Sequence, residues 1–260
     1  MPPIESPTYP LLGIPLSPMP LSQALDRALE AVSQNQPRIM NFCTVNTLVE
    51  AQRSHQLKAA LNRGTNFTDG MPLVWLSQSR GFPSAGRVYG PDFMLGLCRR
   101  GLPLGLRHFF YGGAPGTARR LALHLKARFP GLRVAGHHCP PLLAPGQLDS
   151  RDALDRINDS RAQVVWIGLG TPKQDLWALN HRDRLKAPIL AGVGAAFDFH
   201  SGQKSQAPGW MQSRGLEWLF RFIQEPRRLG LRYLVYNPVF LACLALELSG
   251  LHSFAPKEVS

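Results

Sequence analysis

The chain has 260 residues, of which 44% are hydrophobic, enough for one large α/β domain or for one domain with a C-terminal extension. Its formal net charge of +12 at pH 7 favours anionic partners such as nucleotide phosphates, nucleic acid or an anionic membrane surface, without choosing among them. The four cysteines form no Cys-x-x-Cys pair, which excludes a small disulfide-framed class and is typical of reduced thiols in a cytosolic protein.

No charged segment followed by an apolar one opens the chain, so no signal peptide is expected. The most apolar late stretch, 238–246, has about half of the length that a bilayer-spanning helix needs. A transmembrane protein is therefore not expected, whereas a protein that lies on a membrane surface is compatible with the sequence.

Apolar runs and helical periodicity alternate along most of the chain. Strands are expected at 11–16, 39–44, 65–68, 107–111, 132–136, 164–167 and 189–193. Helices are expected at 22–32, 47–63, 73–78, 93–100, 117–129, 149–159 and 172–184, with a proline-rich loop at 140–145. This alternation predicts an α/β fold with a mainly parallel, doubly wound sheet flanked by helices.

The pattern changes after residue 199, first to a polar segment with glycine and proline and then to a basic, aromatic helical tail. We therefore expect a core at 1–203 and a basic amphipathic helical appendage at 204–260. Arg221, Arg228 and Arg232 are seven and then four residues apart, so on a continuous helix they would share one face with Glu225. Pro226 is expected to begin a second helix.

Two readings of this tail stay open. It is either an ordinary solvated helix packed on the core or an interfacial element that meets lipid headgroups and diphosphates. Nucleic acid could use the same charges, but no helix-turn-helix, zinc finger or RNA-binding motif is visible.

Polar side chains follow two of the expected strands. Thr44 and Asn46 come directly after the second strand, and Asp69 follows the third, between a threonine and a glycine. Because the carboxyl ends of parallel strands meet at one edge of a sheet, these side chains could face one crevice. Asp69 is the candidate chemical centre, as a general base. The alternative is that Asp69 only caps the following helix, the commonest role of an Asp in that place.

Two other strands end in glycines that open helices, around Gly112-Gly113 and around Gly168-Leu169-Gly170 with Lys173 close behind. Glycine lets backbone N–H groups approach phosphate oxygens, and the helix dipole adds positive potential, so the pair of turns favours nucleotide-phosphate binding. The alternative is that these glycines simply make tight turns. Neither turn is a Walker A loop or a full dinucleotide fingerprint, which counts against an epimerase or dehydrogenase.

No metal site is expected. The adjacent residues His137, His138 and Cys139 alternate faces on an extended segment and cannot easily chelate one ion together. The chain also lacks an Asp-x-Asp, the common carboxylate clamp for a metal-bound nucleoside diphosphate.

An ordered series of motifs covers nearly the whole chain, from about residue 11 to residue 236, and resembles the WecG/TagA/CpsF family of bacterial glycosyltransferases. The series comprises Thr44-x-Asn46, Thr68-Asp69-Gly70, Arg87-Val88-x-Gly90-x-Asp92, Gly112-Gly113, Gly168-Leu169-Gly170-x-Pro172-Lys173-Gln174, Gly192-Val193-Gly194-Ala195-x-Phe197-Asp198 and Gly215-Leu216-Glu217-Trp218-Leu219-x-Arg221 through Glu225-Pro226-x-Arg228. No single motif is decisive, but the order is specific.

The resemblance implies a Rossmann-like core and an inverting, metal-independent transfer with no cofactor. The sugar, N-acetylmannosamine or a related hexose or uronic acid, would pass from a UDP-sugar to a polyprenyl-diphosphate-linked saccharide. Such a reaction serves teichoic acid, capsule or exopolysaccharide synthesis at the inner face of the cell membrane, and a homo-oligomer is possible. The rival class is a basic nucleotide- or nucleic-acid-binding module without transferase activity.

The resemblance also implies roles for individual residues. Asp69 matches the proposed general base, and Arg87 a basic residue that meets phosphate charge. Residues that match the lining of the catalytic pocket are Thr44, Asn46 and Gln174. Residues expected to bind the donor are Gly112, Gly113, Gly168, Gly170, Pro172, Lys173, Gly192, Gly194 and Asp198, the last of these near the uracil. Residues expected to meet the membrane or the acceptor diphosphate are Arg221, Arg228 and Arg232.

Overall fold

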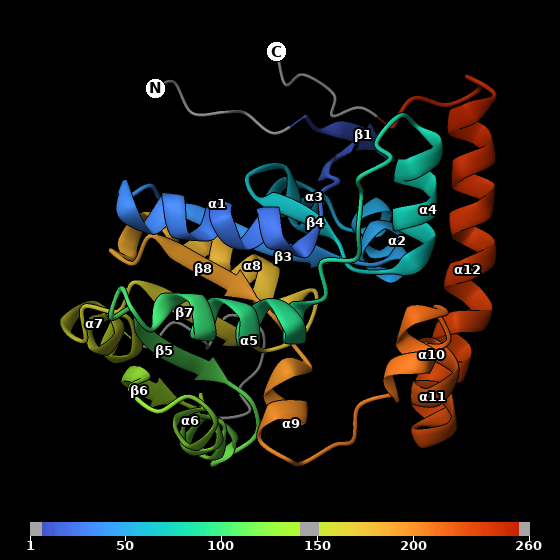
Figure 1. The fold of residues 1–260 in the computed structure, drawn as a ribbon. Helices are drawn as coiled ribbons and strands as arrows, with labels where there is room; N and C mark the ends of the chain where they lie inside the picture. The colour runs from blue at the N-terminus through green and yellow to red at the C-terminus, as the bar shows by residue number, and fades with distance from the viewer. Residues whose placement is uncertain (1–6, 141–150, 255–260) are drawn as a thin grey trace. The chain divides into compact units, whose positions relative to one another are not determined.

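The computed structural model describes residues 7–140 and 151–254 and has an α/β fold with an eight-stranded, mostly parallel sheet flanked by helices (Figure 1). This confirms the predicted fold class. The chain divides into two compact units, a smaller one of Met1–Pro20, Cys43–Arg87 and Gln206–Ser260, and a larger one of Leu21–Phe42 and Val88–Ser205. The proposed division at residue 203 into a core and a membrane-associating appendage remains a prediction. Most of the predicted proline-rich loop, and the start of the helix expected at 149–159, lie outside the described residues.

The smaller unit opens with a hairpin instead of the single strand expected at 11–16. Strand β1 (Tyr9–Leu11) pairs antiparallel with β2 (Ile14–Ser17), and β2 pairs parallel with β4 (Thr65–Thr68). The hairpin turns at Leu12 and Gly13, which both have positive φ angles of 52° and 71°. A Cβ on Gly13 would lie 1.8 Å from the carbonyl oxygen of Phe254, so only glycine fits where this turn meets Phe254.

The helix expected at 47–63 is two helices, α2 (Val45–Arg53) and α3 (His55–Asn62). Ser54 separates them because it has an extended backbone and its hydroxyl accepts a hydrogen bond from the N–H of Leu57, at 3.2 Å. A serine in this role is a preferred N-cap, and the periodicity of the apolar residues did not reveal it.

The C-terminal part of the smaller unit is helical, as predicted. It contains α10 (Gly209–Ser213), α11 (Glu217–Gln224) and α12 (Pro226–Leu248), and Pro226 begins the last helix as expected. Helix α12 packs against α2, and Tyr236 of α12 donates a hydrogen bond to Glu50 of α2. Phe240 is buried in the same apolar cluster as Leu48 of α2. One face of α12 is therefore part of the hydrophobic core of this unit. The remaining helix of the unit is α4 (Met71–Ser79).

The described part of the larger unit contains parallel strands in the order β3-β8-β7-β5-β6. Their bounds are β3 (Arg38–Cys43), β5 (Arg107–Gly112), β6 (Arg133–His138), β7 (Val164–Gly168) and β8 (Ile189–Gly192). Its helices among the described residues are α1 (Leu21–Ser33), α5 (Gly90–Gly101), α6 (Thr117–Arg128), α7 (Arg151–Asp159), α8 (Lys173–His181), the 3-10 turn η1 (Arg182–Arg184) and α9 (Ala196–His200). Apart from α9, which is only five residues long, each α-helix of this unit lies where the sequence analysis expected one.

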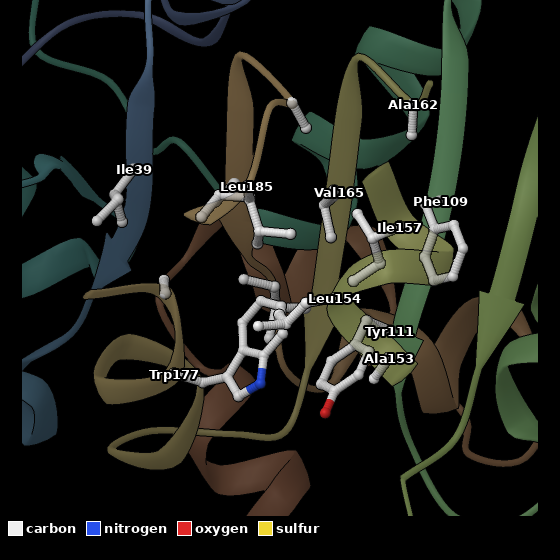
Figure 2. Packing of buried hydrophobic residues seen from close by; sticks show 14 residues of the cluster. Ile39, Phe109, Tyr111, Ala153, Leu154, Ile157, Ala162, Val165, Trp177 and Leu185 are labelled. Carbon is white, nitrogen blue, oxygen red and sulfur yellow. The ribbon is translucent and has the colours of Figure 1, made fainter. Parts of the chain in front are cut away.

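Side chains of the larger unit alternate between the two faces of the strands. Phe109 and Tyr111 of β5 pack with residues of α7 and α8, among them Leu154 and Trp177 (Figure 2). On the opposite face, Trp166 of β7 contacts the ring of Phe93 from α5, with a centroid distance of 6.1 Å. Helices therefore cover both faces, as a doubly wound sheet requires.

Candidate active site

Asp69 lies at the carboxyl end of β4, where the sequence placed it. Its backbone N–H donates to the carbonyl oxygen of Cys43, the last residue of β3, at 2.9 Å. Thr44, the residue after Cys43, therefore lies next to the turn that contains Asp69. A Cβ on Gly70 would lie 3.7 Å from the Cα of Thr44, an ordinary packing distance. The two polar segments meet at one edge, as the parallel pattern predicted.

Asp69 is not the cap of the helix that follows it. The N-cap of α4 is Gly70, which makes no side-chain hydrogen bond. The carboxylate of Asp69 instead pairs with Arg87, whose NH2 group lies 3.4 Å from Oδ1. Arg87 also donates from Nε to the backbone carbonyl oxygen of Asp69, at 2.7 Å. The N-cap position that the sequence analysis left open for Asp69 thus belongs to Gly70, and the carboxylate of Asp69 is only 13% exposed.

Arg87 is placed by the segment on which it lies. The hydroxyl of Thr68, the last residue of β4, donates to the carbonyl oxygen of Gly86 at 3.1 Å. This bond ties the end of the strand to the residue just before Arg87. Arg87 therefore contacts Asp69 from a fixed backbone, which favours a reproducible geometry of the pair.

A second carboxylate, Glu217 at the start of α11, also binds Arg87. The NH2 group of Arg87 donates to Oε2 of Glu217, and the NH2 group of Arg221 lies 2.6 Å from Oε1 of the same side chain. Asp69, Arg87, Glu217 and Arg221 thus form a row of alternating charge. Glu217 is only 8% exposed, so its charge needs these partners.

Thr44 and Asn46 differ in how their side chains are used. Thr44 is the N-cap of α2 and accepts a hydrogen bond from the N–H of Thr47 at 3.4 Å, within a capping box. Asn46 lies in the first turn of the same helix, and its Oδ1 is buried without a hydrogen-bond donor among the described residues. An acceptor left in this state costs about 1–3 kcal/mol, so Asn46 is the better candidate for a ligand contact.

The glycine turns of the larger unit fall into two kinds. At Gly112, which has φ of +125°, a Cβ would lie 2.7 Å from the carbonyl oxygen of Gly168, and the N–H of Gly113 donates to that oxygen at 2.9 Å. A Cβ on Gly168 would lie 2.4 Å from the ring of Phe197. A Cβ on Gly113, which has φ of +76°, would lie 2.8 Å from Cβ of Thr117. Close packing therefore requires glycine at all three positions, which agrees with the alternative that these glycines make tight turns.

Gly170 is different because the space that a Cβ would occupy is empty. It has φ of +74°, and a Cβ there would meet nothing within 4 Å. Lys173, the first residue of α8, is exposed just after it, and Pro172 is the N-cap. This turn combines free backbone space, a helix start and a cation, and so it keeps the predicted features of a phosphate-binding turn.

Gln174 holds two strand ends in place. Its Oε1 accepts from the N–H of Gly170 at 3.1 Å, and its Nε2 donates to the carbonyl oxygen of Gly192 at 2.8 Å. A Cβ on Gly192 would lie 3.1 Å from that Nε2, and Gly194 has φ of +50°. The side chain is buried, so these hydrogen bonds give Gln174 a role in shaping the turn.

Asp198 lies in the short helix α9, with its Oδ2 at 3.5 Å from Nζ of Lys204. Its backbone carbonyl oxygen accepts from the N–H groups of Gln203 and Lys204 at 2.9 and 3.1 Å.

Asp175 is a buried carboxyl in the first turn of α8 that the sequence analysis did not single out. Burial raises its pKa to about 6, although a hydrogen bond from the side chain of Thr171 opposes the shift.

The basic tail is not one continuous helix. Glu225, with φ of −134° and ψ of 61°, breaks the chain between α11 and α12. Arg221 therefore lies on a different helix from Arg228 and Arg232, and the common face expected for a continuous helix is not formed. The side chains of Arg228 and Arg232 lie outside what the structure describes, so their contacts remain predictions.

The smaller unit exposes several large apolar side chains. Leu234, Leu241 and Leu248 of α12 are 74%, 63% and 66% exposed and are seven residues apart, which places them on one stripe of the helix. Exposed tryptophans of the unit are Trp75, Trp210 and Trp218. Within the described ranges, no helix has both the length and the apolar character needed to cross a membrane.

No group of three or more His, Cys, Asp or Glu side chains is arranged to hold a metal ion in residues 7–140 and 151–254. His138 instead stacks on Tyr111, with a centroid distance of 5.7 Å, and Cys139 accepts a hydrogen bond from the N–H of Ala118 at 3.4 Å. Both side chains thus have packing roles.

Comparison with known proteins identifies the family. The model of the glycosyl transferase WecG/TagA/CpsF family matches residues 9–253. A relative from Bacillus spizizenii, described as an N-acetylglucosaminyldiphosphoundecaprenol N-acetyl-beta-D-mannosaminyltransferase, is 29% identical over 181 residues, which cover 69% of this chain and 68% of the relative. A relative of the same description from Staphylococcus aureus is 26% identical over 214 residues, 80% of this chain and 77% of the relative. The chain is a glycosyltransferase of the WecG/TagA/CpsF family.

Proposed function

We propose that this glycosyltransferase moves an N-acetylmannosamine-type sugar from a UDP-sugar to a polyprenyl-diphosphate-linked saccharide, with inversion at the anomeric carbon. The names of the two relatives support this choice of sugar and acceptor. The observation that carries the chemical part is the Asp69 carboxylate, which is largely buried, does not cap a helix and is held by Arg87 at the end of β4.

In the proposed reaction, Asp69 accepts the proton of the acceptor hydroxyl as that oxygen forms a bond to the anomeric carbon. The bond from this carbon to the diphosphate oxygen breaks, and UDP leaves with the electron pair. A single displacement of this kind inverts the anomeric configuration. Arg87 would meet the phosphate charge that develops on UDP, because its guanidinium lies beside the base.

The other residues have supporting roles in the proposal. The buried Oδ1 of Asn46, which has no donor in the part of the chain that the structure describes, would accept a hydrogen bond from a sugar hydroxyl, and Thr44 would shape the start of the helix that presents it. The open turn at Gly170, with Lys173, would contact the diphosphate of the donor, and Gln174 would hold that turn. The remaining residues proposed for donor binding are Gly112, Gly113, Gly168, Pro172, Gly192, Gly194 and Asp198.

We further propose that the smaller unit meets the cytoplasmic face of the membrane, where a polyprenyl-linked acceptor resides. The stripe of Leu234, Leu241 and Leu248 would enter the headgroup region, and Arg221, Arg228 and Arg232 would meet lipid or acceptor phosphates. Three exposed leucines at heptad spacing are unusual on a helix that faces water alone. A homo-oligomer could cover the same stripe.

The reaction is tested by UDP release from a panel of UDP-sugars, with and without a short-chain polyprenyl-diphosphate-GlcNAc acceptor, and with and without EDTA. Acceptor-dependent release with UDP-N-acetylmannosamine that survives EDTA is the expected result. Release that requires a divalent ion would refute the metal-independent mechanism. Silence over the whole panel, together with steeply salt-dependent oligonucleotide binding, would instead favour the nucleic-acid-binding module.

Membrane association is tested by co-sedimentation with anionic vesicles. Leu241→Ser should weaken vesicle binding several-fold, because it removes a leucine from the stripe. Leu123→Ser is a matched control, since Leu123 is similarly exposed, at 56%, but lies on α6 of the larger unit. Equal binding by both variants and the native chain would refute the role of the stripe.

A further inference from the structure

We infer that Glu217 is a positioning residue of the proposed reaction. By binding Arg87, it links helix α11 to Asp69, the candidate base. This inference rests on the proposed function, because it takes Asp69 as the base. Glu217 stands in one of the motifs that carry the family resemblance, but the motif gives it no role, and it is 130 positions from Arg87 in the sequence. The argument comes from three contacts of the smaller unit.

The first contact is the sharing of Arg87 between two carboxylates. Its NH2 group donates to Glu217 and lies 3.4 Å from Oδ1 of Asp69, while its Nε donates to the backbone carbonyl oxygen of Asp69. A guanidinium is planar, so its donors move together when the plane turns. Glu217 therefore helps to fix the plane that holds both the backbone and the side chain of Asp69.

The second contact is the anchoring of Glu217 itself. Arg221, one turn further along α11, binds the other carboxylate oxygen at 2.6 Å. Both oxygens of Glu217 thus have a guanidinium partner, and the side chain is only 11% exposed. If Glu217 lost its charge, Asp69 would be the anionic partner left to Arg87 of these two carboxylates. The guanidinium plane of Arg87 would then turn relative to Asp69.

The third contact places the start of α11 against the helix that follows Asp69. Gly215, two residues before Glu217, has φ of +71°, and a Cβ there would lie 3.2 Å from Cβ of Met71 and 3.5 Å from Cη2 of Trp75. Met71 and Trp75 belong to α4. The tail segment therefore touches the turn of Asp69 through both charge and packing, and a displacement of α11 would reach the base through Glu217.

Glu247 provides a matched control. It is also a carboxylate on the C-terminal helical part, in α12, and it also ties that part to a distant segment. Its Oε1 accepts from the N–H of Leu12 at 2.9 Å, and its Oε2 lies 3.6 Å from Arg80. The Glu247 side chain is 20% exposed. Glu217→Gln and Glu247→Gln each remove a charge that tethers the tail, but only Glu217 binds the arginine that holds Asp69.

The kinetic test uses the full chain with the acceptor in vesicles. Glu217→Gln should lower kcat by about 10- to 100-fold and change KM for the UDP-sugar by less than about threefold. The reason is that Arg87 orients the base and meets phosphate charge that develops only in the transition state, so the loss should fall mainly on kcat. Glu217→Asp, which keeps the charge on a shorter side chain, should retain more activity than Glu217→Gln. Glu247→Gln should stay within about twofold of the native kcat. Equal losses in Glu217→Gln and Glu247→Gln would overturn the inference.

Hydrogen–deuterium exchange without substrate separates this inference from the proposed reaction. Glu217→Gln should raise exchange in segments 69–79 and 215–224, whereas Glu247→Gln should raise it around the hairpin at 9–17. If the native chain transfers no sugar, the proposed function fails, but the exchange experiment still tests the link. If exchange at 69–79 is unchanged in Glu217→Gln, the inference fails whatever the native activity.

Discussion

The turn after β4 and the glycine turns after β5 and β7 are built in different ways. In the smaller unit, charged side chains from distant segments hold the turn of Asp69, with Arg87 and Glu217 as its partners. In the larger unit, backbone groups and close packing hold the turns, as at Gly112, where a side chain would collide with Gly168. The first construction holds the carboxylate of Asp69 through charged partners, whereas the second fixes the path of the backbone through hydrogen bonds and close contacts. Substitutions should therefore affect catalysis at the first turn and folding at the second.

The largest effect on folding is expected for Gly112→Ala. A Cβ at that position would lie 2.7 Å from the backbone of Gly168, at a φ angle that side chains rarely adopt. We expect a loss of about 2–4 kcal/mol in the free energy of unfolding, measured by urea denaturation, since overpacking and strain add together.

Gly170→Ala is the control for that substitution. It also has positive φ, at +74°, but its Cβ would enter open space, so we expect a loss of only about 1 kcal/mol from backbone strain. Equal losses at the two positions would show that packing does not distinguish the turns. A large loss of UDP affinity in Gly170→Ala alone would sharpen the assignment of that turn to the donor.

The buried carboxyl of Asp175 should make the stability of the chain depend on pH. Because burial raises its pKa to about 6, against 3.8 in the unfolded chain, the folded state binds more protons between these values. The contribution of Asp175 to stability is therefore greatest below pH 3.8 and is lost as pH rises through 6. Asp175→Asn, which stays neutral, should raise the free energy of unfolding at pH 7 by up to about 3 kcal/mol.

The measurement is the difference in stability between the native chain and Asp175→Asn from pH 4 to pH 7. This difference should grow with pH and level off above pH 6. The difference between the two proteins is used because His108, which is present in both, changes stability with pH in the opposite direction to Asp175. Burial lowers the pKa of His108 to about 4, so its contribution makes the native chain more stable as pH rises from 4 to 6.5. A difference that is constant with pH would contradict the account of Asp175.

The smallest effects separate two residues at the start of α2, its N-cap Thr44 and Asn46 in its first turn. Thr44→Ala should cost about 1 kcal/mol of stability, because the hydroxyl caps the helix. Asn46→Ala should leave stability within about 0.5 kcal/mol or increase it, because the amide oxygen has no donor among the described residues. Asn46→Ala should nevertheless lower kcat/KM for the UDP-sugar. If Asn46→Ala destabilises the fold and leaves turnover unchanged, its proposed ligand contact is wrong.

Local patterns in the sequence predicted most of the elements of both units. Alternating apolar runs located the parallel strands, and the place of Asp69 at a strand end followed from the position of β4. The hairpin at Gly13 and the break at Ser54 were missed, because each depends on one residue within an otherwise regular apolar pattern. The contact of Glu217 with Arg87 was missed for another reason. It joins segments 130 residues apart, and no periodicity relates them.

The glycine motifs could not be interpreted fully from the sequence, because their roles also depend on contacts with other segments. Gly112 and Gly170 look alike in the sequence, as glycines that follow strands. Only the surrounding atoms separate them, since a Cβ meets the backbone of Gly168 in one case and open space in the other.

The central claim, that Asp69 is the base, is tested most directly by turnover of Asp69→Asn beside Asp26→Asn. Asp26 also pairs with an arginine, Arg100, but its side chain is 66% exposed and it lies on α1. Asp69→Asn should lower acceptor-dependent UDP release by about 10²- to 10⁴-fold, the usual contribution of a general base, while UDP still binds and the chain remains folded. Asp26→Asn should behave as the native chain. Near-normal turnover in folded Asp69→Asn would contradict the account and remove Asp69 from the mechanism.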